Sequence, residues 1–122
     1  MIKSVLIIDD ERDLCEVMSR ALKKEGFEVD CAFNLAEARL KLSVRPDIVI
    51  LDNNLPDGSG IDFLQMHPVE FMESFVILIT ADPSTSLQKK AVHEGIQAYL
   101  PKPFSIDLMR EVIKPLNSRT GS

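Results

Sequence analysis

The sequence is poor in several residue types, and each shortage excludes a class of protein. It has two cysteines, Cys15 and Cys31, at a spacing that matches no metal or redox motif, so we expect reduced interior thiols rather than a disulfide framework. Its 14 lysines and arginines are outnumbered by 19 acidic residues, which leaves a net charge of -5. A chain this acidic is a poor candidate for direct binding of nucleic acid, because the phosphate backbone requires a basic face.

Long hydrophobic runs are absent as well. No stretch approaches the roughly 20 apolar residues of a membrane span, and no signal-peptide cleavage site follows the first four residues. We therefore predict a cytoplasmic protein that does not associate with membranes. The apolar fraction is 45 % and the charged fraction 27 %, as in an ordinary globular domain. Residues 1–122 are accordingly predicted to form one domain, with a core over about 3–117 and a short C-terminal tail.

Short apolar runs alternate with helical patterns along the chain. The runs at 5–8, 48–51 and 75–79 are continuous and rich in β-branched residues, which is typical of strands buried on both faces of a parallel sheet. Residues 27–31 alternate between apolar and polar, and residues 98–100 end at a proline, so both are predicted at sheet edges. The pattern predicts an α/β fold, a doubly wound five-stranded parallel sheet of order 2-1-3-4-5 (flavodoxin-like).

Five helices are predicted to connect and follow these strands. The first carries an apolar stripe over residues 14–22, the second runs from Asn34, a good N-cap, to about residue 43, and the third is short, near 61–66. The segment 66–74 has no predicted element.

The fourth helix is expected to follow Pro83 and to stop at Gly95, and the fifth to cover about 105–116. The fourth has the weakest apolar stripe, with Leu87, Ala91 and Val92 as its main anchors. Few buried contacts imply low local stability, so this helix is the expected moving part of the domain.

Polar side chains follow each central strand and the last one. Asp9 and Asp10 follow the first strand, Asp52 the third, Thr80 the fourth and Lys102 the fifth. In such sheets functional residues gather at the carboxyl ends of the strands, so we expect these side chains to converge. Three carboxylates repel one another unless a cation joins them, and clustered oxygen ligands favour a hard divalent ion such as Mg²⁺. An aspartate can also be the nucleophile of phosphoryl transfer, with positive charge placed around the phosphoryl oxygens.

The same residues, with two short motifs, resemble the receiver domain of two-component response regulators over about residues 3–117. Residues 52–60, Asp-Asn-Asn-Leu-Pro-Asp-Gly-Ser-Gly, are similar to the loop that follows the phosphorylated aspartate of that family. Residues 99–104, Tyr-Leu-Pro-Lys-Pro-Phe, are similar to the end of its fifth strand. Asn53 departs from the pattern, because an apolar or small residue is common directly after the acceptor.

The resemblance implies a role for each residue of the acidic cluster. Asp52 would accept the phosphoryl group, and Lys102 would pair with a phosphoryl oxygen. Asp10, Asp52 and the backbone carbonyl of Asn54 would ligate Mg²⁺, with Asp9 acting mainly through water. Asp52, Lys102 and Thr80 would thus carry the chemistry.

The resemblance also implies a switch made of Thr80 and Tyr99. Thr80 would move toward the phosphoryl group, and Tyr99 would turn inward behind it. Asn54 and Asp82 occupy positions that tune hydrolysis of the acyl phosphate in this family. A cis peptide bond between Lys102 and Pro103 is a further feature that the resemblance implies.

The function implied is a phosphorylation-dependent signalling switch rather than a conventional enzyme, since the domain assists its own phosphorylation and dephosphorylation. Phosphorylation would change the surface of the fourth helix, the fifth strand and the fifth helix to control an output domain or partner. The implied partners are a sensor histidine kinase or phosphotransfer protein, a downstream output domain, and a second copy of the chain in a phosphorylation-dependent dimer.

Three other functions fit the residues less well. An FMN-binding domain needs a phosphate loop free of acids, whereas the first strand is followed by Asp9, Asp10 and Glu11. A calcium loop starting at Asp52 fails at its fifth, sixth and twelfth positions. A phosphate-ester hydrolase acting through Asp52 commonly has an acid two residues further on, where Asn54 stands, and a chromogenic phosphate ester would test it.

Overall fold

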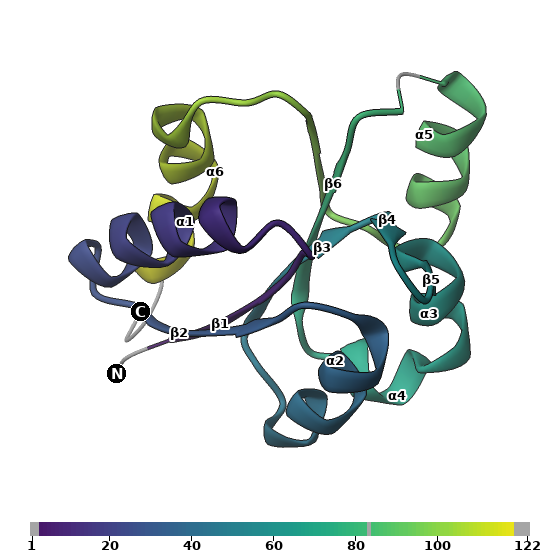
Figure 1. The fold of residues 1–122 in the computed structure, drawn as a ribbon, viewed down its shortest axis with the longest axis horizontal. Helices are drawn as coiled ribbons and strands as arrows, with labels where there is room; N and C mark the ends of the chain where they lie inside the picture. Colours follow the sequence, from purple (N-terminus) through teal and green to yellow (C-terminus); the bar gives the residue numbers. More distant parts are fainter. Residues whose placement is uncertain (1–2, 83, 119–122) are drawn as a thin grey trace.

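The computed structural model describes residues 3–82 and 84–118, and a five-stranded parallel sheet lies at its centre (Figure 1). The strands, in their order across the sheet, are β2 (Glu28–Ala32), β1 (Ser4–Ile8), β3 (Ile48–Asp52), β6 (Phe75–Thr80) and β7 (Ala98–Pro101). Every neighbouring pair is parallel. The predicted α/β fold and the order 2-1-3-4-5 are confirmed, including the two edge strands.

Helices cover both faces of this sheet. In Figure 1, α1 (Arg12–Lys24) and α6 (Ile106–Ser118) lie on one side, and α2 (Leu35–Lys41), α3 (Gly60–Met66) and α5 (Thr85–His93) lie on the other. Successive side chains of a strand point to opposite faces, so Val5 and Ile7 join the core under α1 and α6, whereas Leu6 and Ile8 join the other core. The central strands are buried on both faces, which is why their sequences are continuous apolar runs.

The number of helices differs from the prediction by one. A four-residue helix, α4 (Pro68–Phe71), lies in the segment for which no element was predicted, so the described residues contain six α-helices instead of five. Pro68 occupies its first turn, and Phe71 is buried edge-to-face on Phe63 with ring centroids 5.9 Å apart. One turn of helix is too short to produce a helical period in the sequence. A 3₁₀ turn, η1 (Leu42–Val44), extends α2.

The anchors of α5 were predicted correctly in two of three cases. Ala91 is buried and Leu87 is half-buried against the sheet, but Val92 is 75 % exposed, so its place in the apolar stripe was wrong. Val92 lies next to Ala91 in a helix with a narrow buried face, and successive residues are about 100° apart around a helix. The helix follows Pro83 as predicted, since it begins at Thr85 with Ser84 as its N-cap. The predicted C-terminal tail after residue 118 lies outside the described residues.

Both cysteines are free thiols, as expected, Cys15 buried and Cys31 half-buried. The Cys15 Sγ donates to the backbone oxygen of Asp9, 3.2 Å away, at the end of β1. The Lys102–Pro103 peptide bond is cis, in agreement with the resemblance. Within residues 3–82 and 84–118, no helix has both the length and the apolar character needed to cross a membrane.

Candidate functional site

Three aspartates meet where the neighbouring strands β1 and β3 end. Asp9, Asp10 and Asp52 each offer a carboxylate oxygen, and these oxygens all lie within 4.8 Å of one another. Asp9 and Asp52 are buried, and Asp10 is exposed. From β1 the chain continues outward to β2 on one side of the sheet and from β3 to β6 on the other. The loops that follow β1 and β3 therefore run to opposite faces of the sheet, and a crevice opens between them at the carboxyl ends of these strands. The structure therefore brings together the three acids that the sequence predicted.

Backbone contacts hold the buried Asp9 in a fixed orientation. Its N–H donates to the carbonyl of Ala32 at 3.0 Å, and its Oδ1 accepts the N–H of Glu11 at 2.9 Å. Its Oδ2 is buried and accepts no aligned hydrogen bond among the described residues, although the Nζ of Lys102 lies 3.0 Å away as an ion-pair partner. A buried carboxylate oxygen directed into a cluster of acids leaves a position that a cation would satisfy.

Lys102 reaches the acidic cluster from the end of β7. Its Nζ lies 3.2 Å from Asp52 Oδ2, 3.0 Å from Asp9 Oδ2 and 2.6 Å from Glu11 Oε1, and the side chain is only 14 % exposed. Burial lowers the pKa of the ammonium, but the neighbouring carboxylates, Glu11 and Asp9 first among them, outweigh burial and hold that pKa above its usual value. Lys102 therefore stays positively charged beside Asp52. Glu11 directly follows the two aspartates in the sequence but was not predicted to take part in this contact.

The environment of Asp52 disfavours its charged form. Burial is the largest cause, and together with the nearby Asp9 it raises the pKa of Asp52 to about 6, although the N–H of Asn54 and the Lys102 ammonium act in the opposite direction. The Asn54 N–H donates to Asp52 Oδ1 at 3.1 Å. An added divalent cation would favour the carboxylate. The donor set of carboxylate oxygens, with one buried oxygen that accepts no hydrogen bond among the described residues, fits a hard divalent ion.

The two predicted switch residues, Thr80 and Tyr99, both form a hydrogen bond with the backbone of Asp82, a contact that was not predicted. Thr80 is fully buried at the end of β6, and its Oγ1 accepts the N–H of Asp82 at 3.0 Å. The hydroxyl of the half-buried Tyr99 donates to the carbonyl of the same Asp82 at 2.7 Å. The structure thus joins Thr80 and Tyr99 through the backbone of Asp82, in the loop that leads to α5.

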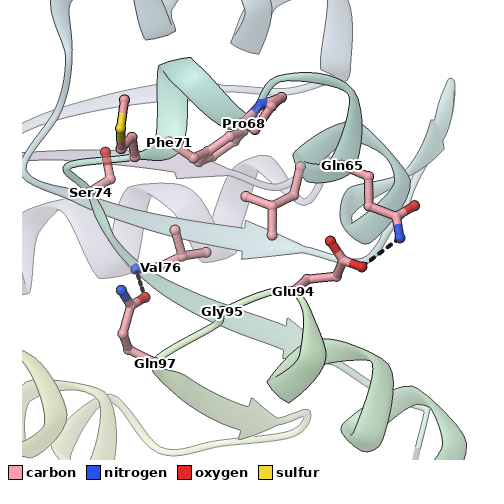
Figure 2. A pocket seen from close by; sticks show the side chains of 10 residues that line it. Gln65, Pro68, Phe71, Ser74, Val76, Glu94, Gly95 and Gln97 are labelled. Carbon is pink, nitrogen blue, oxygen red and sulfur yellow. Dashed lines mark hydrogen bonds between the residues drawn. The ribbon is translucent and has the colours of Figure 1, made fainter.

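A separate pocket lies at the opposite end of the sheet. It has a volume of about 220 Å³ and lies between α3, α4 and the turn that precedes β7 (Figure 2). Its polar groups are engaged with each other or with backbone: Gln65 donates to Glu94 at 2.7 Å, and Gln97 accepts the Val76 N–H at 2.8 Å. The acidic cluster at the carboxyl ends is therefore the stronger candidate site.

Comparison with known proteins agrees with this geometry. The sequence profile described as the response regulator receiver domain matches residues 5–114. The chain is 37 % identical over 122 residues to the probable transcriptional regulatory protein TcrX of Mycobacterium tuberculosis, covering 97 % of this chain and 51 % of that protein. It is 31 % identical over 118 residues to the transcriptional regulatory protein TctD of Salmonella typhimurium, covering 96 % of this chain and 53 % of TctD. The chain thus spans about half the length of these curated relatives.

Solved structures show the same likeness. A CheY-like response regulator receiver domain protein from Methanospirillum hungatei superposes with a TM-score of 0.88 at 26 % identity, covering 98 % of this chain and 96 % of that one. A two-component response regulator from Clostridium difficile superposes with a TM-score of 0.89 at 25 % identity, covering 98 % and 99 % of the two chains.

Proposed function

The chain belongs to the family of response regulator receiver domains, which signal through phosphorylation, and we propose that Asp52 is its phosphoryl acceptor. The observation that carries this assignment is the pairing of a buried carboxylate with a half-buried cation. Asp52 Oδ2 lies 3.2 Å from the Nζ of Lys102, at the strand end where Asp9 and Asp10 also gather. Residues 1–122 would form one receiver domain with its core over about 3–117.

The chemistry follows from the positions of these side chains. An Asp52 carboxylate oxygen attacks the phosphorus of a phosphohistidine, the new O–P bond forms, the N–P bond breaks, and the imidazole keeps the electron pair. Lys102 pairs with a phosphoryl oxygen and stabilises the charge that develops there. Asp10, Asp52 and the Asn54 carbonyl, with Asp9 acting mainly through water, would hold Mg²⁺, which would supply further positive charge to the phosphoryl oxygens. Attack by water later releases phosphate, so the domain assists its own phosphorylation and dephosphorylation without acting as a conventional enzyme.

The switch would operate through Asp82. If the Thr80 hydroxyl turns to a phosphoryl oxygen, it releases the Asp82 N–H, and the carbonyl that Tyr99 binds can then move as well. Tyr99 would turn inward, and the surface formed by α5, β7 and α6 would change. Phosphorylation would thus shift the equilibrium between two conformations of this surface.

The partners proposed are a sensor histidine kinase or phosphotransfer protein and an output domain. A groove of about 410 Å³ lined by Glu11, Leu14, Lys102 and Phe104 lies beside the acceptor and would admit the donor histidine. The curated relatives are transcriptional regulatory proteins of about twice this length, which favours an output domain that controls transcription. The phosphorylation-dependent dimer and the cytoplasmic location stay predictions.

Labelling tests the acceptor. Incubation with acetyl phosphate and Mg²⁺ is expected to add the mass of one phosphoryl group, labile to hydroxylamine, and a chelator is expected to prevent it because the acidic cluster then lacks its cation. Asp52→Asn should not be labelled. Asp62→Asn removes an exposed aspartate of α3 and should be labelled like the wild type. Equal labelling of Asp52→Asn, or labelling without any divalent ion, would contradict the assignment.

A further inference from the structure

The side chain of Asn53, directly after the acceptor, is buried but takes no part in the acidic cluster. It is 9 % exposed, and burying an amide costs stability unless the amide is hydrogen-bonded. Its Oδ1 accepts two hydrogen bonds, one from the Ser59 hydroxyl and one from the Ile61 N–H, each 3.1 Å long. Both partners lie at the start of α3, so the side chain spans the loop from its first residue to its last.

Asn53 also supplies most of the N-terminal cap of α3. The first N–H groups of a helix have no partner inside the helix. The Gly60 N–H donates to the Asn53 carbonyl at 2.9 Å, and the Ile61 N–H donates to Asn53 Oδ1. The Asp62 N–H donates to the Ser59 hydroxyl oxygen at 3.4 Å, and that hydroxyl itself donates to Asn53. Three successive donors of the helix are therefore tied to Asn53, directly or through Ser59.

This cap closes the loop that carries Asn54. The short strands β4 (Asn54–Leu55) and β5 (Gly58–Ser59) pair Asn54 with Ser59, so the loop leaves the sheet and returns beside Asn53. The Asn53 N–H donates to the carbonyl of Ile79 at 3.0 Å, which attaches the root of the loop to β6. The position of Asn54 is thus set by a closed ring of hydrogen bonds with Asn53 at its base.

We infer that Asn53 is a positioning residue of the phosphoryl site, because its side chain closes the loop between β3 and α3 and so sets the place of the Asn54 carbonyl. The inference rests on the proposed function, since this carbonyl matters to the site only if the cluster holds Mg²⁺. An apolar side chain of the same size would fill the space but could not accept the Ile61 N–H. The polar residue that departs from the family pattern therefore has a physical role.

Asn53→Leu tests the inference, because leucine has a similar size and no acceptor. Isothermal titration calorimetry of the unphosphorylated variant with Mg²⁺ should show a Kd about tenfold higher than that of the wild type. Loss of a group that orients a metal ligand usually weakens metal binding by about ten- to a hundredfold, and we expect the smaller effect. Hydrogen exchange of the Ile61 amide in the metal-free protein should become faster. Phosphorylation by acetyl phosphate should recover at high Mg²⁺ concentration. Because Mg²⁺ also stabilises the folded state, circular dichroism without Mg²⁺ should first show that the variant is folded, which separates a weaker metal site from a general loss of stability.

Two variants serve as controls. Asn34→Leu removes another asparagine cap, whose side chain accepts the Glu37 N–H of α2 at 2.8 Å, and should leave the Kd for Mg²⁺ unchanged. Asn53→Asp keeps an acceptor oxygen and should keep slow exchange at Ile61. If Asn53→Leu does not fold, Ser59→Ala removes one of the two bonds to Oδ1 and should raise the Kd in the same direction by a smaller factor.

The outcomes separate this inference from the proposed function. A folded Asn53→Leu protein, or Ser59→Ala in its place, with the Mg²⁺ affinity of the wild type would overturn the positioning role and leave Asp52 as the acceptor. A wild-type protein that binds no Mg²⁺, or that is not phosphorylated on Asp52, would overturn both.

Discussion

Replacing Asp52 with asparagine is expected to stabilise the metal-free protein at neutral pH. Burial, with the nearby Asp9, raises the pKa of Asp52 from its ordinary value of 3.8 to about 6. The folded protein therefore holds the proton of this carboxyl more tightly than the unfolded chain does, and ionisation at neutral pH lowers the free energy of unfolding. Asparagine has nearly the same shape and carries no charge into the buried position.

The size of the gain follows from the pKa. Each pKa unit corresponds to about 1.4 kcal/mol, so the difference between 3.8 and about 6 corresponds to roughly 3 kcal/mol. Part of this gain is lost in the variant, because an amide oxygen accepts the Asn54 N–H and a Lys102 N–H less strongly than a carboxylate does. We expect a net stabilisation of about 2 kcal/mol, or about 8 °C in Tm for a domain of this size.

The stabilisation of Asp52→Asn relative to the wild type should increase as the pH rises. Below about pH 4 the carboxyl is protonated in both the folded and the unfolded state, so wild type and Asp52→Asn should differ little. As the pH rises from about 4 through about 6, the unfolded chain releases the proton first, and the wild type loses stability relative to the variant. Above about pH 7 the difference should be complete and constant.

Urea unfolding followed by circular dichroism, in the presence of a chelator and at about pH 4, 6 and 7.5, measures this difference. Asp107→Asn is a matched control, because the Asp107 side chain is 86 % exposed and pairs only at the surface with Arg110. It should change stability by less than about 0.5 kcal/mol at every pH. Adding Mg²⁺ should stabilise the wild type more than Asp52→Asn, since the ion binds the folded state through this carboxylate.

Two results would refute the reasoning. If Asp52→Asn is no more stable than the wild type at about pH 7.5, the buried carboxylate is not a source of strain in the metal-free protein. If the stabilisation is as large at about pH 4 as at neutral pH, its cause is not the charge of Asp52.

Two further substitutions probe the switch and the loop. Thr80→Ala should keep its Mg²⁺ affinity but lose most of the NMR amide shifts that beryllofluoride and Mg²⁺ induce over residues of about 83 to 104, with the region of about 34 to 43 as the reference. Shifts as large as in the wild type would show that the coupling takes another route. Gly60→Ala should lower the free energy of unfolding by about 2 kcal/mol, because a Cβ there would collide with the backbone oxygen of Asp52 and lie 3.0 Å from Leu51. A midpoint of urea unfolding equal to that of the wild type would contradict this close approach.

Local patterns in the sequence were enough to predict the sheet. The three continuous apolar runs became the central strands, and the alternating segment at 27–31 became the edge strand β2, one residue later at Glu28–Ala32. Helix limits followed from local chemistry too: the Asn34 side chain caps α2 through the Glu37 N–H. These features depend on residues a few positions apart, whose periodicity and capping chemistry are visible in one dimension. The convergence of Asp9, Asp52 and Lys102 was also predictable, because parallel strands bring their carboxyl ends to one edge.

What only the tertiary structure decided is which polar groups are partners. Lys102 contacts Glu11, which is 91 positions away in the sequence, as well as Asp52, which is 50 positions away. No local sequence pattern indicates which of the acids Lys102 will contact. The link of Thr80 and Tyr99 through Asp82 arises because β6 and β7 lie side by side. The polar Asn53 looked like an exception in the sequence, yet in the fold its side chain meets the unpaired N–H groups of α3. Hydrogen bonds and ion pairs at short range depend on positions to within tenths of an ångström, which are set only when the cores on both faces of the sheet are packed.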